Sequence, residues 1–134
     1  MKKVRTVIER ASDGSYSIYM DIEPKEMDYF ITASGKSMEE AKEDFFKCYE
    51  EMREHYKETG RPFTEVEFCF EYDVVSYLEY YSSLFTLCGL SKITGIAKGQ
   101  LSHYVTGKNK PNAKNEQKIL EGLRAFGRDI AQLG

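Results

Sequence analysis

Apolar and polar residues alternate with a period of two in three segments of the N-terminal half, a period typical of β-strands with one buried face. Residues 4–10 alternate and lead into Asp13 and Gly14, a pair that favours a tight hairpin turn. Residues 16–22 return with apolar side chains on one face. Residues 29–34 are rich in aromatic and β-branched residues, and residues 63–72 alternate again. The pattern predicts four strands.

A helical pattern separates the third predicted strand from the fourth. Ser37 and Glu40 have the spacing of a capping box, in which side chains satisfy the first free backbone amides of a helix. Gly60 and Pro62 end the pattern. Between them, apolar residues recur along one stripe: Met38, Ala41, Phe45, Cys48, Tyr49, Met52 and Tyr56. The order is βββαβ, and because one helix covers only one face of a small sheet, the opposite face or an edge strand stays available to another chain.

From residue 73 onward the pattern is helical only. Asp73 is placed to cap a helix that reaches about residue 84, and a final helix starts near residue 113 with apolar residues as far as Leu133. Gly122 and Gly127 lie inside this last helix, where glycine disfavours a regular helix but permits close helix contact across a dimer. We therefore predict an α+β protein with a βββαβ domain over residues 1–72 and an all-α domain over residues 73–134.

Residues 86–107 have the spacing of a helix-turn-helix, the motif that places its second helix in the DNA major groove. Gly95 fits the tight turn, small Ser91 stands where two crossing helices come closest, and Leu101 and Tyr104 return to the core. Amide and cationic side chains suit base edges, and loop lysines suit phosphates. The residues expected to contact DNA are Thr86, Lys98, Gly99, Gln100, Ser102, His103, Thr106, Lys108, Asn109 and Lys110.

The charge distribution separates the two predicted domains. The 134-residue chain has a formal net charge of -3, but residues 1–72 carry 11 basic and 17 acidic side chains, whereas residues 73–134 carry 8 basic and 5 acidic ones. Residues 92–118 alone contain six lysines and one glutamate. This basic segment overlaps the predicted helix-turn-helix and is suited to phosphate contacts.

Cysteine use and hydropathy argue against a disulfide-rich, zinc-binding, secreted or membrane protein. Cys48, Cys69 and Cys88 are odd in number, widely spaced and flanked by apolar residues, so we expect reduced core thiols without a disulfide framework or a zinc site. The chain starts directly with a strand pattern, and no apolar run approaches membrane-spanning length. We expect a cytoplasmic protein that needs no cofactor and does not contact a membrane.

With both halves considered, the chain resembles the HicB family of antitoxins, in the form whose βββαβ domain precedes a helix-turn-helix domain of the XRE, or Cro/repressor-like, type. The N-terminal resemblance rests on residues 13–16 in the first hairpin and on residues 32–41 leading into the helix. The C-terminal resemblance rests on residues 95–97, residues 101–104, Gly107 and Pro111. Residues 23–28 depart from the family pattern, because they lack the Pro-Asp-Leu-Pro-Gly-Cys-like segment usual after the second strand.

The resemblance implies an N-terminal domain with a partial RNase H-like fold that covers a small RNA-cleaving toxin of the HicA type, and a C-terminal domain that represses the shared operon. The acidic N-terminal half agrees in sign with a basic toxin. Recognition of two half-sites of double-stranded operator DNA predicts a homodimer. The alternative hypothesis is a stand-alone XRE-like transcriptional regulator whose N-terminal domain senses a ligand or another protein.

A third hypothesis, a metal-dependent nuclease, requires several carboxylates that converge on one or two cations. The candidates are Asp21, Glu23, Asp28 and Glu39, which are spread over strand, loop and helix start without recognisable spacing. His55 lies among glutamates on the predicted helix, and His103 has no nearby carboxylate or cysteine in the sequence, so both histidines favour surface roles. We therefore expect the protein not to be an enzyme.

Overall fold

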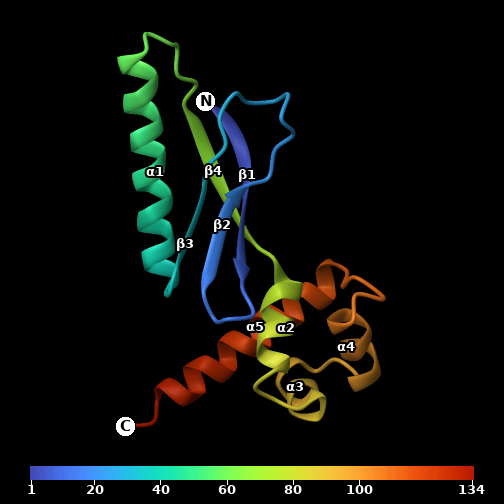
Figure 1. Ribbon diagram of the computed structural model, residues 1–134. Helices are drawn as coiled ribbons and strands as arrows, with labels where there is room; N and C mark the ends of the chain where they lie inside the picture. The colour runs from blue at the N-terminus through green and yellow to red at the C-terminus, as the bar shows by residue number, and fades with distance from the viewer. The chain divides into compact units, whose positions relative to one another are not determined.

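The computed structural model describes residues 1–134 and contains one four-stranded sheet and five helices, so the protein is of the α+β class (Figure 1). The chain divides into two compact units. Met1–Asp73 holds the sheet and helix α1, and Val74–Gly134 holds the other four helices. None of the five helices combines the length and the apolar character needed to span a bilayer.

The sheet of the first unit has the strand order β3-β2-β1-β4. Its strands are β1 (Lys2–Arg10), β2 (Tyr16–Met20), β3 (Thr32–Gly35) and β4 (Val66–Tyr72). β1 and β2 pair antiparallel across the predicted hairpin, where Gly14 has a φ of 89°. β4 pairs parallel to β1, so the chain has to cross the sheet before β4, and α1 lies in this crossover.

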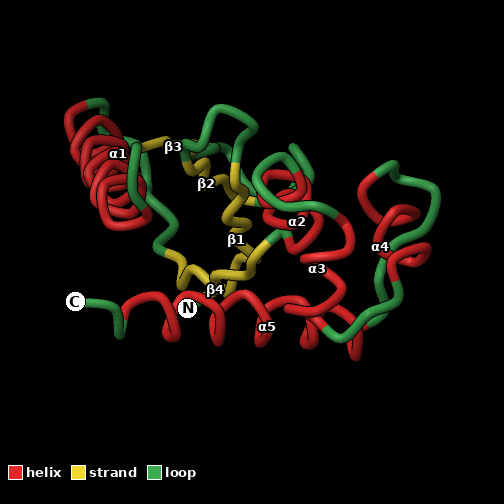
Figure 2. The backbone as a smooth tube through the Cα atoms, turned by 90° about the horizontal axis from the view of Figure 1, so that it is seen from below, coloured by secondary structure: helices red, strands yellow, loops and turns green.

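Helix α1 (Met38–Glu58) packs on one face of the sheet and lies alongside β3 (Figure 2). It begins as predicted at Ser37, whose side chain accepts a hydrogen bond from the Glu40 amide at 3.0 Å. Phe45 packs edge-on against Phe68 of β4, with ring centroids 4.8 Å apart. The buried residues of α1 all belong to the predicted apolar stripe: Ala41, Phe45, Tyr49 and Tyr56. The sequence pattern therefore identified the helix face that covers the sheet.

Three strands are shorter than the sequence pattern indicated. β2 ends at Met20, β3 begins only at Thr32, and β4 begins only at Val66. For β3 and β4 the reason lies in Tyr29 and Phe63, whose rings stack on each other with centroids 4.9 Å apart. Tyr29 is buried, and its hydroxyl donates to the Thr64 carbonyl at 2.6 Å. Aromatic packing therefore replaces strand pairing at the start of both segments.

The second unit consists of α2 (Val74–Ser82), α3 (Leu87–Thr94), α4 (Lys98–Val105) and α5 (Ala113–Ala131). Its core contains Val74, Leu78, Leu90, Ile96, Leu101, Tyr104 and Ile119. α5 continues without a break through Gly122, where an added Cβ would lie 2.4 Å from the Ile93 carbonyl oxygen. The glycine was expected to permit contact across a dimer, but in the structure Gly122 makes its close contact with α3 of the same unit, and α5 is regular there.

Candidate nucleic-acid interface

The three residues between α3 and α4 form a turn held by hydrogen bonds within the chain. Gly95 has a φ of 75°, and its amide donates to the Ser91 carbonyl at 2.8 Å, which closes α3. The Ser91 hydroxyl donates to the Ile96 carbonyl at 2.7 Å, and the Ile96 side chain is buried. Ser91 therefore fixes the turn with its hydroxyl in addition to being small.

The two helices of this pair begin differently. The Thr86 side-chain oxygen caps α3 as predicted, accepting from the Gly89 amide at 3.0 Å. α4 starts after Ala97, which makes no side-chain capping bond. Ala97, Lys98 and Gly99 are all exposed. The first amides of α4 are thus available to an acceptor from outside the chain.

Helix α4 presents its polar residues to different degrees. Leu101 and Tyr104 are fully buried, and they fix which side of the helix faces outward. Among the residues expected to contact DNA, Lys98, Gly99 and Thr106 are exposed, whereas Gln100, Ser102 and His103 are half-buried. The outward face of α4 is therefore the one that the apolar spacing predicted, although three of its side chains are partly enclosed.

Gln100 is held by side chains of its own unit. Its Nε2 atom donates to the Tyr104 hydroxyl at 3.0 Å, and the Asn115 side chain on α5 donates to the same hydroxyl at 2.6 Å. The Gln100 amide can bind a base edge only with its remaining polar groups or after breaking this bond. No local sequence signal indicates this arrangement, because Asn115 lies on another helix.

The loop after α4 is organised around His103. Gly107 has a φ of 79°, and its amide donates to the Tyr104 carbonyl at 3.2 Å. The Lys108 amide donates to the His103 carbonyl at 2.9 Å, which completes a Schellman motif. The Asn109 side-chain nitrogen lies 3.4 Å from His103 Nδ1. Asn109 therefore helps to orient the His103 ring.

The exposed surface of this region carries cations and no carboxylates. Lys108 and Lys110 are exposed, and the loop that holds them is anchored by buried Pro111. Residues 86–112 contain neither Asp nor Glu. All residues expected to contact DNA lie on α4 or on the loop after it, except Thr86 at the start of α3. Such a surface is suited to phosphate groups.

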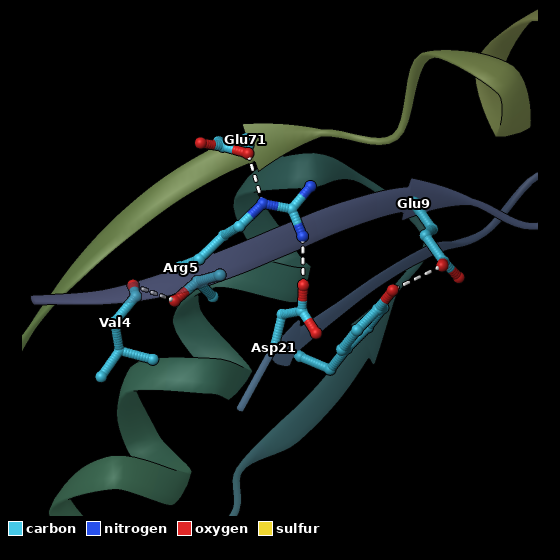
Figure 3. Close-up of polar contacts among 7 residues, drawn as sticks. Val4, Arg5, Glu9, Asp21 and Glu71 are labelled. Atoms are coloured by element: carbon cyan, nitrogen blue, oxygen red, sulfur yellow. Dashed lines mark hydrogen bonds and ion pairs between the residues drawn. The ribbon is translucent and has the colours of Figure 1, made fainter. Parts of the chain in front are cut away.

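In the first unit, two of the four carboxylates considered for a metal site, Asp21 and Asp28, pair with arginines. Asp21 forms an ion pair with Arg5 of β1, and Arg5 also bonds Glu71 of β4 at 2.5 Å (Figure 3). Asp28 pairs with Arg61 at 3.2 Å. The chain contains no group of three or more His, Cys, Asp or Glu side chains arranged to hold a metal ion.

A second polar contact lies near Arg5. The Tyr19 hydroxyl donates to Glu9 at 3.0 Å (Figure 3). Burial, together with the hydrogen bond to Glu9, raises the pKa of Tyr19 to about 12, so the hydroxyl remains a donor at neutral pH. Arg5 and Tyr19 alternate with the buried residues Thr6 and Ile18 that point toward the α1 side. On the sheet face away from α1, Arg5 and Tyr19 therefore pair with carboxylates of the same unit.

Comparison with protein-family models, curated proteins and solved structures found no match to this chain. Function is therefore inferred from the residues and their geometry.

Proposed function

We propose that the protein is a HicB-like antitoxin that represses its own operon. In this proposal, α3 and α4 form a helix-turn-helix that binds operator DNA, and Met1–Asp73 neutralises a small, basic, RNA-cleaving toxin of the HicA type by binding it. The observation that carries the proposal is the start of α4. It follows a turn fixed by Gly95 and Ser91, it has no side-chain cap, and it lies in a segment with lysines and no carboxylates.

The DNA-binding step follows from these contacts. α4 enters the major groove, where Lys98, Ser102 and His103 are the side chains closest to base edges. Lys108 and Lys110 contact the phosphates on either side of the groove, because they are exposed on the loop that follows α4. The Tyr104 hydroxyl, bonded to Gln100 and Asn115, supports α4 from behind.

Electrophoretic mobility shifts with the DNA upstream of the protein's own gene test this step. We expect Lys98→Ala to reduce discrimination between operator and unrelated DNA. We expect Lys108→Ala to weaken binding to both DNAs equally and to lower the slope of log affinity against log salt by about one. Lys25→Ala is the matched control, because Lys25 is an exposed lysine of the first unit. If Lys98→Ala and Lys108→Ala both bind operator and unrelated DNA as the unaltered chain does, α4 is not the recognition helix.

The partner-binding step is supported by charge. Residues 1–72 carry 17 acidic and 11 basic side chains, which favours a basic partner such as an RNA-cleaving protein. Co-expression with the neighbouring reading frame is the test. We expect a small basic protein to co-purify with the chain and its toxicity to be suppressed. If the neighbouring frame encodes no such protein, the antitoxin half of the proposal is wrong.

The proposed repressor acts as a homodimer, because two recognition helices about one helical turn apart read two half-sites. Ile130 on α5 is 47% exposed, and Leu133, two residues after the end of the helix, is 79% exposed. Sedimentation or light scattering of the full chain measures the dimer directly.

The second candidate function is a stand-alone XRE-like regulator that senses a ligand or a protein. A groove between α1 and the β3 edge favours it, since Phe30, Ile31 and Met52 line a space of about 400 Å³. Normal operator binding in a genome context without a toxic neighbour would favour this candidate over the antitoxin.

A further inference from the structure

The groove of the first unit lies beside β3, an edge strand of the sheet. β3 pairs only with β2, so its other side has no strand partner. Phe30, Ile31 and Thr32 form this wall of the groove, and the Phe30 side chain is 53% exposed. An exposed aromatic residue at an open strand edge is a feature that a binding partner covers.

The strand register shows which backbone groups of β3 face the groove side. Tyr19 stands opposite Thr32 and Ser17 opposite Ser34, while the Met20 amide donates to the Ile31 carbonyl at 3.2 Å. In an antiparallel pair, hydrogen-bonded and non-bonded positions alternate, so Thr32 and Ser34 occupy the non-bonded positions. Their amides and carbonyls therefore point away from β2, toward the open edge, in the arrangement that an additional strand requires.

Helix α1 supplies the opposite wall. Cys48, Glu51, Met52 and His55 line the groove, at the three- and four-residue spacing of one helix stripe. Burial raises the pKa of the Cys48 thiol, so this side chain stays neutral and acts with Met52 as an apolar surface. Glu51 adds a carboxylate to the same wall and also belongs to an outer patch in which the glutamates Glu50, Glu54 and Glu58 outnumber its one lysine, Lys47.

These charges decide between occupants of the groove. A second copy paired edge to edge at β3 would bring the Glu51 side chains of two such walls toward each other, and the like charges would repel. An acidic or nucleic-acid partner is disfavoured for the same reason. The opposite sheet face is less suited to a basic partner, because its carboxylates Asp21 and Glu71 are already paired with Arg5. A basic protein segment is the occupant that fits both the charge and the open strand edge.

We infer that this groove binds an extended, basic segment of a partner protein, which adds as a fifth strand to β3. An apolar side chain of the segment packs between Phe30 and Met52, and a lysine or arginine of the segment pairs with Glu51. The inference rests on the proposed partner-binding role of Met1–Asp73 and names the surface and the binding mode. It is independent of DNA binding by Val74–Gly134.

The probe is a random twelve-residue peptide library displayed on phage and selected against the full chain. We expect the enriched peptides to lack proline and to alternate lysine or arginine with Val, Ile, Leu or Phe. The tightest synthetic peptide should shift the backbone amide resonances of Thr32 and Ser34 in nitrogen-15 spectra. Failure to enrich peptides over an unrelated bait, or enrichment of acidic peptides, would overturn the inference.

Two variants with a matched control locate the binding surface. Thr32→Pro removes an outward amide without removing a hydrogen bond to β2, and Glu51→Lys reverses the charge of the groove. Each variant should lower the affinity for the peptide by about tenfold or more. Glu43→Lys makes the same charge change on α1 outside the groove and should leave the affinity unchanged. Circular dichroism and the amide dispersion of nitrogen-15 spectra of the peptide-free variants confirm that Met1–Asp73 is folded in each. Equal peptide affinity for Thr32→Pro and the unaltered chain would exclude strand addition at β3.

The neighbouring-frame protein separates this inference from the proposed function. If that protein binds both variants as tightly as the unaltered chain, the antitoxin proposal stands and the groove inference is wrong. If groove-binding peptides are selected while no neighbouring protein binds, the groove inference stands and the antitoxin proposal is wrong.

Discussion

Two glycines of α5 have different surroundings although both lie inside the same continuous helix. At Gly122 an added Cβ would lie 2.4 Å from the Ile93 carbonyl oxygen and 2.9 Å from the Thr94 Cα, whereas at Gly127 no atom lies within 4 Å. We expect Gly122→Ala to lower the free energy of unfolding by about 1–3 kcal/mol through overpacking. Gly127→Ala should raise it by about 0.5–1 kcal/mol, because alanine loses less backbone entropy in a helix. Urea unfolding followed by circular dichroism measures both, and a stability loss at Gly127 would contradict its open surroundings.

At the scale of single residues, sequence reasoning succeeded where the cause is local. Ser37, Thr86 and Gly95 were assigned from their own backbone requirements, and the structure confirms two caps and a positive φ at these positions. Sequence reasoning did not predict the hydrogen bond from Gln100 to the Tyr104 hydroxyl, because that hydroxyl also accepts from Asn115 on another helix. Side-chain pairing between elements depends on tertiary packing, which a single sequence does not display.

At the scale of elements, periodicity located every helix and strand, but it extended three strands too far. Residues 29–31 and 63–65 have strand composition, yet Tyr29 and Phe63 stack on each other ahead of β3 and β4. Aromatic residues satisfy both a strand pattern and a packed loop, so composition alone does not separate the two. The strand order β3-β2-β1-β4, which makes β3 an edge, likewise follows from pairing between distant segments.

The uncapped start of α4 provides a test in which stability and binding change in opposite directions. Ala97→Asp supplies a capping acceptor and should stabilise the unit by about 1 kcal/mol. The same carboxylate should repel DNA phosphates and weaken operator binding. Ala97→Ser is the control, because it adds a cap without charge and should stabilise the unit with little effect on binding. Thermal unfolding and mobility shifts give the two readouts. Full operator affinity of Ala97→Asp would mean that this helix end does not face DNA.

At the scale of the whole molecule, opposite charges accompany the division into two units. The net-acidic residues 1–72 and the net-basic residues 73–134 suit partners of opposite sign, so the proposed toxin and operator do not compete for one surface. The chain changes from one unit to the other between Asp73 and Val74, with no intervening linker. This separation of partners predicts that a stability defect in one unit leaves the binding function of the other unit intact.

A pair of matched core substitutions tests this separation. Ile18 of the sheet and Ile119 of α5 are both fully buried, and Ile119 belongs to a core drawn only from the second unit. Ile→Val at either position removes one methylene and should lower stability by about 0.5–1.5 kcal/mol. We expect Ile18→Val to speed amide hydrogen exchange in β1 and β2 and to leave exchange in α4 and operator affinity unchanged. Ile119→Val should speed exchange in α4 and α5 and leave the sheet unchanged, because each unit opens around its own buried residues. If either variant speeds exchange equally in both units, the chain unfolds as one cooperative body, and partner binding at the sheet can then also stabilise Val74–Gly134.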